Sequence, residues 1–365
     1  MKHKYYWLTL VFAFLALVIF YEFYDFNCPS YSAEEETATT DSTDSSPQDV
    51  SHYPVINYTL VKIDSLRQLS AILRKYSDSV QKEKYYRVLK TLIRREIRFF
   101  GKGSRIIIPD TIIDDMRAYS VFPQNYPGAI ALPKLIMVDA NMQAYGCYEH
   151  GKLVRFAAVN SGKERTPSYP GRYAVNWKQR FKLSSLDSNW KLPFTVNFHQ
   201  EAGSAFHQFD MPGRPVSHSC VRQFLEDAEW LFKWVKTAKF VDGRPEYMTG
   251  TPVVILNTFD YTRKIGGPWH DLKSNRDGIV ALPDNPMAVE EALIPISQIP
   301  RTSRGVLRNR QRYETAEDTL RARGVIRPGV TITPSVDFNH KRRVRKAAQH
   351  KELMKKNTET ENSSQ

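Results

Sequence analysis

Three short apolar runs near the middle of the chain constrain its fold most strongly. They cover residues 135–139, 144–148 and 153–159, and they carry the aliphatic and aromatic side chains that strands favour. Asn141 and Gly151 fall between them, and these residue types are typical of tight turns between consecutive strands. The pattern predicts an antiparallel sheet built from hairpins, and so a mostly β domain.

Apolar spacing and composition divide the rest of the chain. Between residues 63 and 100 apolar residues recur about every 3.6 positions, which predicts two helices. Further helical segments are expected at 111–119, 225–239 and 288–299, with Trp269 anchoring a loop before the last of them. The predicted organisation is a membrane anchor or signal segment at 1–29, a flexible linker at 30–52, a helical subdomain at 53–131, a β domain at 132–258 and a C-terminal extension with a basic tail at 259–365.

The N-terminus predicts export. Lys2 and Lys4 precede an apolar run at 5–21, which at about 1.5 Å per residue is just long enough to cross a bilayer core. Bulky or charged residues at 22–27 favour an uncleaved anchor over a cleaved signal peptide, although cleavage stays open. We therefore expect an extracytoplasmic protein that is tethered to the cytoplasmic membrane.

Charge limits the classes of expected binding partner, and cysteine content limits the possible disulfides. The 365 residues carry a formal net charge of +13, which suits nucleic acid, an anionic membrane surface or an anionic wall polymer. Export removes the opportunity for nucleic acid, so none is expected as a partner. The Lys- and Arg-rich tail at 341–356 is either solvated or adheres to an anionic surface. Three cysteines without a CxxC pair give no disulfide framework.

Cys220 carries the strongest chemical signal in the chain. It follows two histidines and precedes the predicted helix at 225–239, an arrangement typical of a thiol nucleophile with a nearby base. Proximity to the helix N-terminus, together with Arg222 and His218, predicts a thiol pKa below its usual value.

His207 is the predicted general base. Gly213 and the prolines around it can reverse the chain and return Cys220 towards His207. His218 lies two residues before the cysteine, too far along an extended strand for a good contact, so it is expected to support the loop. His199 is expected to be an ordinary strand residue. The three histidines and Cys220 are also potential zinc ligands. Their irregular spacing argues against a zinc site, and no metal is predicted.

The motif resembles the catalytic motif of the L,D-transpeptidases of the bacterial cell wall, the YkuD-type domain. The matching residues are His207, Pro212-Gly213 and Ser217-His218-Ser219-Cys220-Val221-Arg222. Ser219 departs from the commoner glycine. Gly162-Lys163, Thr166-Pro167 and a last strand at 251–256 are similar to further family segments, so the resemblance covers about residues 132–256. Sortases also combine cysteine, histidine and arginine, but these lie far apart along their chains.

The resemblance implies a β-sandwich catalytic domain at 132–258 and a two-step acyl transfer that needs no cofactor. Cys220 would form a thioester with a peptidoglycan stem peptide and release D-alanine, and an amine of another stem, a lipoprotein lysine or water would resolve it. Backbone N–H groups at Ser219 and Cys220 would stabilise the oxyanion. Arg222 would orient a substrate carboxylate or brace the loop, and Gln208 would lie near the acceptor that orients His207. Ser217, His218 and Gly213 would support the site.

Two other functions remain open from the sequence. An L,D-carboxypeptidase, or hydrolase of peptidoglycan stems, begins with the same thioester and ends with water. A membrane-tethered wall-binding protein would keep the fold without turnover, and the replacement of glycine by Ser219 is the residue difference that favours it. All three functions place the protein in the cell envelope.

Overall fold

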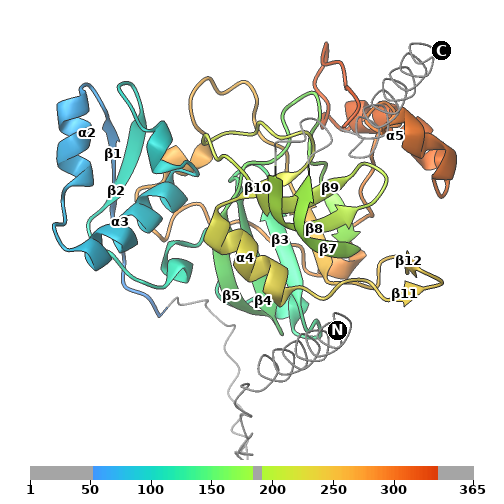
Figure 1. Ribbon diagram of the computed structural model, residues 1–365, viewed down its shortest axis with the longest axis horizontal. Helices are drawn as coiled ribbons and strands as arrows, with labels where there is room; N and C mark the ends of the chain where they lie inside the picture. Colours follow the sequence, from blue (N-terminus) through green and yellow to red (C-terminus); the bar gives the residue numbers. More distant parts are fainter. Residues whose placement is uncertain (1–51, 184–190, 336–365) are drawn as a thin grey trace, which may run out of the picture. The chain divides into compact units, whose positions relative to one another are not determined.

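The three apolar runs form consecutive antiparallel strands, which confirms the predicted hairpins. These strands are β3 (Leu135–Asp139), β4 (Ala144–Glu149) and β5 (Lys152–Ala158). The computed structural model describes residues 52–183 and 191–335 (Figure 1). The predicted anchor, almost all of the linker and the basic tail at 341–356 lie outside the described residues.

The first sheet has five strands and is mixed. Its order is β5-β4-β3-β13-β6, and β13 (Pro252–Leu256) runs parallel to β3 and antiparallel to β6 (Gly171–Ala174). All five residues of β3 are buried because both faces of the sheet are covered. Side chains alternate along a strand, so Ile136 and Val138 enter one hydrophobic core while Leu135 and Met137 enter the other.

The second sheet packs on the first and carries the cysteine motif. Its order is β10-β9-β8-β7, with β10 parallel to β9 and the other pairs antiparallel. Its strands and the helix that contacts β8 and β9 are β7 (Trp177–Leu183), β8 (Lys191–His199), β9 (Ser204–Gln208), β10 (Val221–Gln223) and α4 (Leu225–Trp234). Apolar residues of both sheets, such as Val138 and Phe206, share one core, as in a β-sandwich.

The N-terminal region contributes side chains to the hydrophobic core on the other face of the five-stranded sheet. It contains β1 (Tyr58–Lys62), α2 (Leu66–Leu73), α3 (Ser79–Leu92) and β2 (Arg105–Pro109), and β1 pairs antiparallel with β2. The N-caps of both helices accept a backbone N–H: Ser65 from Gln68, and Asp78 from Gln81. The buried side of α3 shares a hydrophobic core with β3 and β5, so the predicted pair of helices is confirmed.

Arg94 ties this region to the β domain from inside the core. Its side chain is 1% exposed, donates to the carbonyl of Met142 at 3.1 Å, and lies over the rings of Phe156 and Trp269. Burial lowers its pKa to about 10, which still leaves the guanidinium charged at neutral pH. A buried charge of this kind is tolerated because carbonyl oxygens and aromatic faces surround it.

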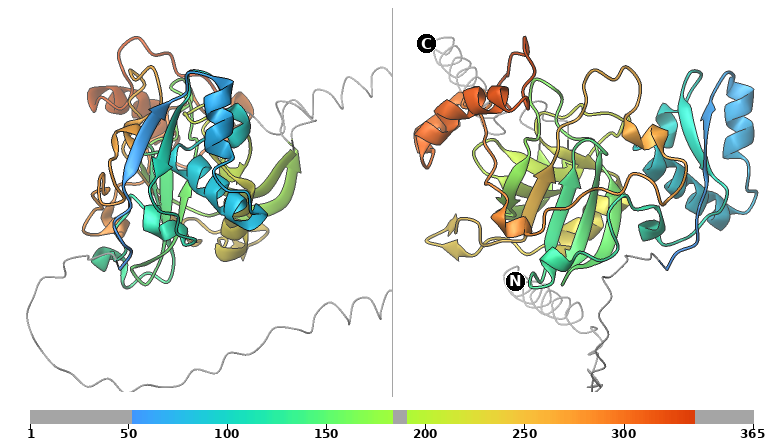
Figure 2. Two further views of the ribbon diagram at one scale, coloured as in Figure 1. Left: turned by 90° about the vertical axis from the view of Figure 1, so that its left-hand side faces the viewer. Right: turned by 180° about the vertical axis from the view of Figure 1, so that it is seen from behind.

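Two of the predicted helices are wrong. Residues 111–119 contain only a 3₁₀ turn at Met116–Tyr119, and 288–299 contain no helix beyond the 3₁₀ turn Pro286–Ala288. This last segment instead runs beside β6, through a bridge between Arg172 and Glu291, so tertiary contacts take the place of helical hydrogen bonds. The view from behind in Figure 2 shows the chain after β13 crossing the outer face of the five-stranded sheet.

The remaining described elements complete the C-terminal part. They are the short strands β11 (Phe240–Val241) and β12 (Arg244–Pro245) and the helix α5 (Arg310–Ala322). Trp269 is fully buried, which confirms its predicted role as an anchor. None of the helices in residues 52–183 and 191–335 is long and apolar enough to cross a bilayer. The described residues belong to one compact unit, and the predicted domain boundaries inside it remain predictions.

Candidate active site

Two neighbouring strands hold the chain at Cys220 next to the strand that carries His207. In the parallel pair β9 and β10, Val221 lies opposite Phe206 and Arg222 lies opposite His207. Phe206 and Val221 both point into the core between the sheets. Because side chains alternate, His207 and Arg222 point to the opposite face, and Cys220 directly precedes β10. The chain at the cysteine is therefore held next to the strand that carries His207.

The Cys220 thiol is buried and weakly acidic. Its Sγ lies 3.7 Å from the carbonyl oxygen of Gly203, and the residue is 4% exposed. Burial raises the pKa of the thiol to about 11, although the backbone of Ala205 and the charges of Arg222 and Lys182 act in the opposite direction. At neutral pH the resting sulfur is therefore a thiol.

The prediction of an acidified cysteine at a helix N-terminus is wrong. β10 (Val221–Gln223) lies between Cys220 and α4, which begins at Leu225. The helix dipole falls off within about one turn. Burial therefore dominates the pKa of the thiol, and the sequence could not reveal this because it shows neither the intervening strand nor the depth of the residue.

His207 is held in one tautomer. Its Nδ1 lies 3.0 Å from the backbone carbonyl of Gln208, and a carbonyl can only accept, so Nδ1 carries the proton. The other nitrogen, Nε2, is left as an acceptor. Burial, the largest cause, lowers the pKa of His207 to about 4, and the charge of Arg222 lowers it further. The imidazole is therefore neutral at pH 7, in the form that a general base requires.

Ser219 occupies a backbone conformation that favours glycine. Its φ is +84°, in the left-handed region where a side chain costs about 1–2 kcal/mol. Its hydroxyl lies 2.9 Å from the Ser204 hydroxyl, and its carbonyl accepts from the Ser168 hydroxyl at 3.0 Å. Both Ser204 and Ser219 are buried. A serine is thus accommodated here because a partner for its hydroxyl is built into β9.

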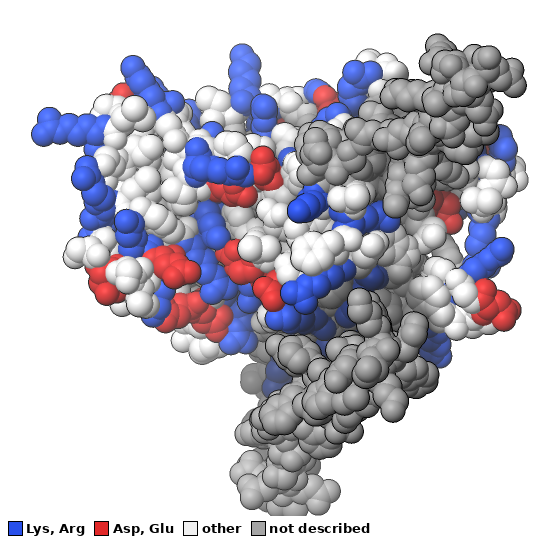
Figure 3. All heavy atoms as spheres, viewed as in Figure 1, with Lys and Arg blue, Asp and Glu red and all other residues white. Residues whose placement is uncertain are grey.

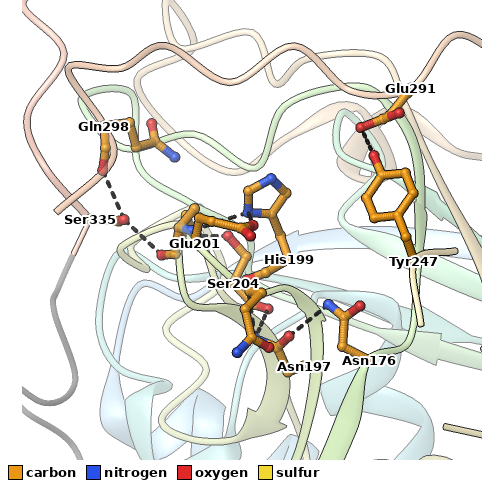
Figure 4. Close-up of polar contacts among 12 residues, drawn as sticks. Asn176, Asn197, His199, Glu201, Ser204, Tyr247, Glu291, Gln298 and Ser335 are labelled. Carbon is orange, nitrogen blue, oxygen red and sulfur yellow. Dashed lines mark hydrogen bonds and ion pairs between the residues drawn. The ribbon is translucent and has the colours of Figure 1, made fainter. Parts of the chain in front are cut away.

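The turn between β8 and β9 is braced by a polar network (Figure 4). The Asn197 amide donates to the carbonyls of Ser204, at 3.0 Å, and His199, at 3.1 Å. His199 accepts the Ala202 N–H at 3.1 Å, and the Ser335 hydroxyl donates to the Ala202 carbonyl at 2.7 Å. His199 therefore acts structurally, and the turn that supplies the Gly203 carbonyl to the thiol is held from two sides.

His218 supports the loop before Cys220 and carries no positive charge. Its Nε2 lies 2.9 Å from Lys163 Nζ. Burial lowers the pKa of His218 to about 4, with further lowering by Lys163 and Arg222, so the predicted positive contribution of His218 is wrong. Ser217 belongs to the same support, because its carbonyl accepts from the Lys163 N–H at 2.9 Å and from the Thr166 hydroxyl at 3.2 Å.

Arg222 and Gly213 hold the loop that joins β9 to the cysteine. Arg222 donates to the Asp210 carbonyl at 3.0 Å and stacks over the Phe209 ring at 4.6 Å, so it braces this loop. Gly213 has φ +87°, and a Cβ there would lie 3.0 Å from the Arg95 side chain. The Gly213 N–H donates to the Asn160 side chain at 3.0 Å.

The structure adds supporting residues that sequence reasoning missed. The Glu96 N–H donates to the Met211 carbonyl at 2.9 Å, so the chain after α3 contacts the active-site loop directly. Asn160 links Gly213 to the carbonyl of Arg94, which its amide reaches at 3.1 Å. Spacing along the chain contains no signal for these contacts. Among the described residues, no three His, Cys, Asp or Glu side chains are grouped as metal ligands.

Comparison with known proteins identifies the domain around these residues. The family model described as the L,D-transpeptidase catalytic domain, YkuD, matches residues 133–255, which confirms the resemblance drawn from the cysteine motif. The match covers both sheets apart from Leu256 at the end of β13, and it includes Cys220 and His207. No curated protein sequence matches the chain.

Solved structures of L,D-transpeptidases match about a third of the chain. One from Stackebrandtia nassauensis is 20% identical over 35% of this chain and 57% of its own, with a TM-score of 0.29. One from Mycobacterium smegmatis and the enzyme LdtMt1, solved with imipenem, are each 16% identical over 34% of this chain and 59% of their own, with TM-scores of 0.28. The chain thus spans less than two thirds of each. TM-scores this low establish no common whole-chain fold, so the family model is the finding that carries weight.

Proposed function

We propose that this chain, whose residues 133–255 match the L,D-transpeptidase catalytic domain, is a cysteine acyltransferase that forms peptidoglycan cross-links. The observation that carries the proposal is the parallel pairing of β9 and β10. It holds the chain at Cys220 next to the strand that carries His207, whose second imidazole nitrogen is left as an acceptor. These are the two groups that nucleophilic acyl transfer requires.

The first half-reaction acylates Cys220. The thiol proton passes to His207 Nε2 as the sulfur attacks the carbonyl carbon that joins the third residue of a stem tetrapeptide to its terminal D-alanine. The tetrahedral intermediate then collapses. His207 returns the proton to the departing amine of D-alanine, and a thioester remains on Cys220. Because thiol and imidazole are both neutral at rest, proton transfer accompanies attack instead of preceding it.

The second half-reaction transfers the acyl group. An acceptor amine attacks the thioester, gives its proton to His207, and the departing sulfur recovers that proton. An amine of a neighbouring stem gives a cross-link between two third residues, and a lipoprotein lysine gives a protein-to-peptidoglycan link. Backbone N–H groups of Ser219 and Cys220 stabilise the oxyanion in both steps, which is worth about 3–4 kcal/mol for one donor in such sites.

Product analysis tests the proposal. Purified protein is incubated with a disaccharide-tetrapeptide, and the products are identified by mass spectrometry. Cross-linked dimer with free D-alanine is the expected result. Tripeptide without dimer would instead identify an L,D-carboxypeptidase, and unchanged substrate would favour a non-catalytic wall-binding protein.

Imipenem provides a test of the nucleophile itself. LdtMt1 has been solved in complex with this compound, and an adduct on Cys220 is expected here. Cys147 offers a matched control, since it is fully buried in β4 and its burial raises the pKa of the thiol. Intact mass should show the adduct on Cys147→Ala and none on Cys220→Ala. An equal adduct on both variants would disprove the assignment.

The site of action in this proposal is the outer side of the cytoplasmic membrane, where stem peptides are found. The apolar run at 5–21 remains as an anchor, and no nucleic acid is bound. Fractionation should recover the full-length chain with the membrane. A mature N-terminus that begins after Ala33 would show cleavage and overturn the anchoring.

A further inference from the structure

A basic pocket adjoins the loop that leads to Cys220. It has a volume of about 360 Å³ and is lined by Lys163, Arg214, Tyr261, Arg263 and Lys264, among others. These residues come from three separate segments: the chain after β5, the loop before the cysteine and the chain after β13. The last segment lies beyond the residues that match the family model, so one wall of the pocket is formed by residues outside the matched domain.

The pocket has uncompensated positive charge. Among the described residues that line it, none is Asp or Glu. The Asp271 carboxylate accepts hydrogen bonds from both terminal nitrogens of Arg263, at 2.9 and 3.2 Å, and so neutralises the charge of that side chain. Within the described part of the chain, Arg214 and Lys264 form no ion pair, and Lys163 contacts only the neutral imidazole of His218 as a side-chain partner. Three cations therefore face the pocket without a carboxylate.

Charges of both signs occur elsewhere on the described surface. The face drawn in Figure 3 mixes Lys and Arg with Asp and Glu side chains, as expected for a solvated surface. In the pocket, burial and the nearby charges of Arg165 and Arg222 lower the pKa of Lys163, which is the electrostatic effect of clustered cations. The Tyr261 hydroxyl donates to the Gly162 carbonyl at 2.7 Å and so fixes the far wall beside Lys163.

Position links the pocket to the reaction. Lys163 contacts His218, and His218 lies two residues before Cys220, so at most about 7 Å separates the Cα atoms of His218 and Cys220. A peptide bound at the sulfur would extend over this distance with a few bonds. Stem peptides carry free carboxylates besides the carbonyl that is attacked, and carboxylates are the groups that lysine and arginine bind most directly.

We propose that Lys163, Arg214 and Lys264 bind a free carboxylate of the stem peptide and orient the peptide at Cys220. The inference rests on the proposed function for the identity of the peptide. It predicts that binding depends on the charge of the peptide, because a carboxamide cannot replace the ionic contact.

Binding to the Cys220→Ala form of the full chain tests the inference without turnover, so its outcome is separate from that of the proposed function. The probes are a stem tetrapeptide and versions in which each free carboxylate in turn is a carboxamide. We expect one carboxamide to bind about tenfold more weakly than the parent peptide. The exposed residues Arg214 and Lys264 suit substitution, and R214Q and K264Q should each weaken the parent peptide about tenfold and remove the preference for the free acid.

The exposed Lys239, which lies outside the pocket, gives the matched control, and Lys239→Gln should leave both affinities unchanged. Equal binding of the parent peptide and every carboxamide would overturn the inference. So would equal losses in the control variant. Competition by inorganic phosphate with no difference between acid and amide would also overturn it, by identifying the pocket as a phosphate site.

Discussion

The contact between Ser204 and Ser219 allows the serine beside the nucleophile to be tested by a double-mutant cycle. Ser219 holds φ +84°, which costs about 1–2 kcal/mol for a residue with a side chain. Its hydroxyl pairs with that of Ser204 at 2.9 Å in a buried position. Such a hydrogen bond contributes about 1 kcal/mol, and leaving one partner buried and unpaired costs about 1–3 kcal/mol.

These magnitudes predict the sign of each change. Ser204→Ala leaves the Ser219 hydroxyl unpaired and should lower the free energy of unfolding by about 1–3 kcal/mol. Ser219→Gly relieves the backbone but leaves Ser204 unpaired, so its net effect should lie within about 1 kcal/mol of zero. The double variant removes both hydroxyls and the strain, and it should be at least as stable as Ser204→Ala, with a coupling energy of about 1–2 kcal/mol.

Urea denaturation of the four proteins measures the cycle, and the rate of imipenem adduct formation on Cys220 reports on the site. Ser219→Gly should change turnover less than tenfold, because a small side chain leaves the neighbouring N–H groups in place. Additive effects on stability, with Ser204→Ala costing under about 0.5 kcal/mol, would refute the reasoning. A gain of several orders of magnitude in turnover on restoring glycine would show instead that the natural protein is close to inactive.

Four further predictions concern the reactive residues and the buried ionisable groups. The pKa of about 11 predicts that alkylation of Cys220 by iodoacetamide accelerates about tenfold per pH unit between pH 7 and 9, and a plateau below pH 7 would contradict this. His207→Ala should abolish most imipenem acylation at pH 7. If His207→Ala keeps the acylation rate and His218→Ala loses it, the roles of the two histidines are exchanged. Burial lowers the pKa of four histidines to about 4, and these are His199, His207, His218 and His270. Their neutral forms therefore contribute stability that is present above about pH 6.5 and is lost as the pH falls towards 4, by up to about 1.4 kcal/mol per pH unit and per residue. Urea titrations at several pH values measure this loss, and a stability that does not change with pH would contradict the prediction. Asp227→Ala should destabilise the protein by about 3–5 kcal/mol, because it removes the carboxylate that lies 2.5 Å from the buried Arg155 guanidinium. As the control, Glu314→Ala in the exposed pair with Arg310 should cost at most about 1 kcal/mol. Similar melting temperatures for the two variants would contradict the prediction.

The sequence by itself determined the local elements that depend on short-range patterns. The short apolar runs in 135–159 specify three strands with turns between them, and the 3.6-residue spacing in 63–100 specifies two helices. The cysteine motif could be recognised as well, because its residue types occur close together along the chain. Helices expected at 111–119 and 288–299 failed where tertiary contacts supplied the backbone partners.

Only the tertiary structure decided what surrounds the sulfur. Burial depth sets the pKa of Cys220 and His207, and it depends on which segments cover them, not on their neighbours in the chain. The short strand between Cys220 and α4 likewise exists because β9 offers an edge to pair with. The partner of Ser219 and the cations of the pocket come from segments separated by tens of residues. Spacing along a chain specifies local geometry, whereas long-range packing specifies solvation and charge, and these decide the chemistry of the site.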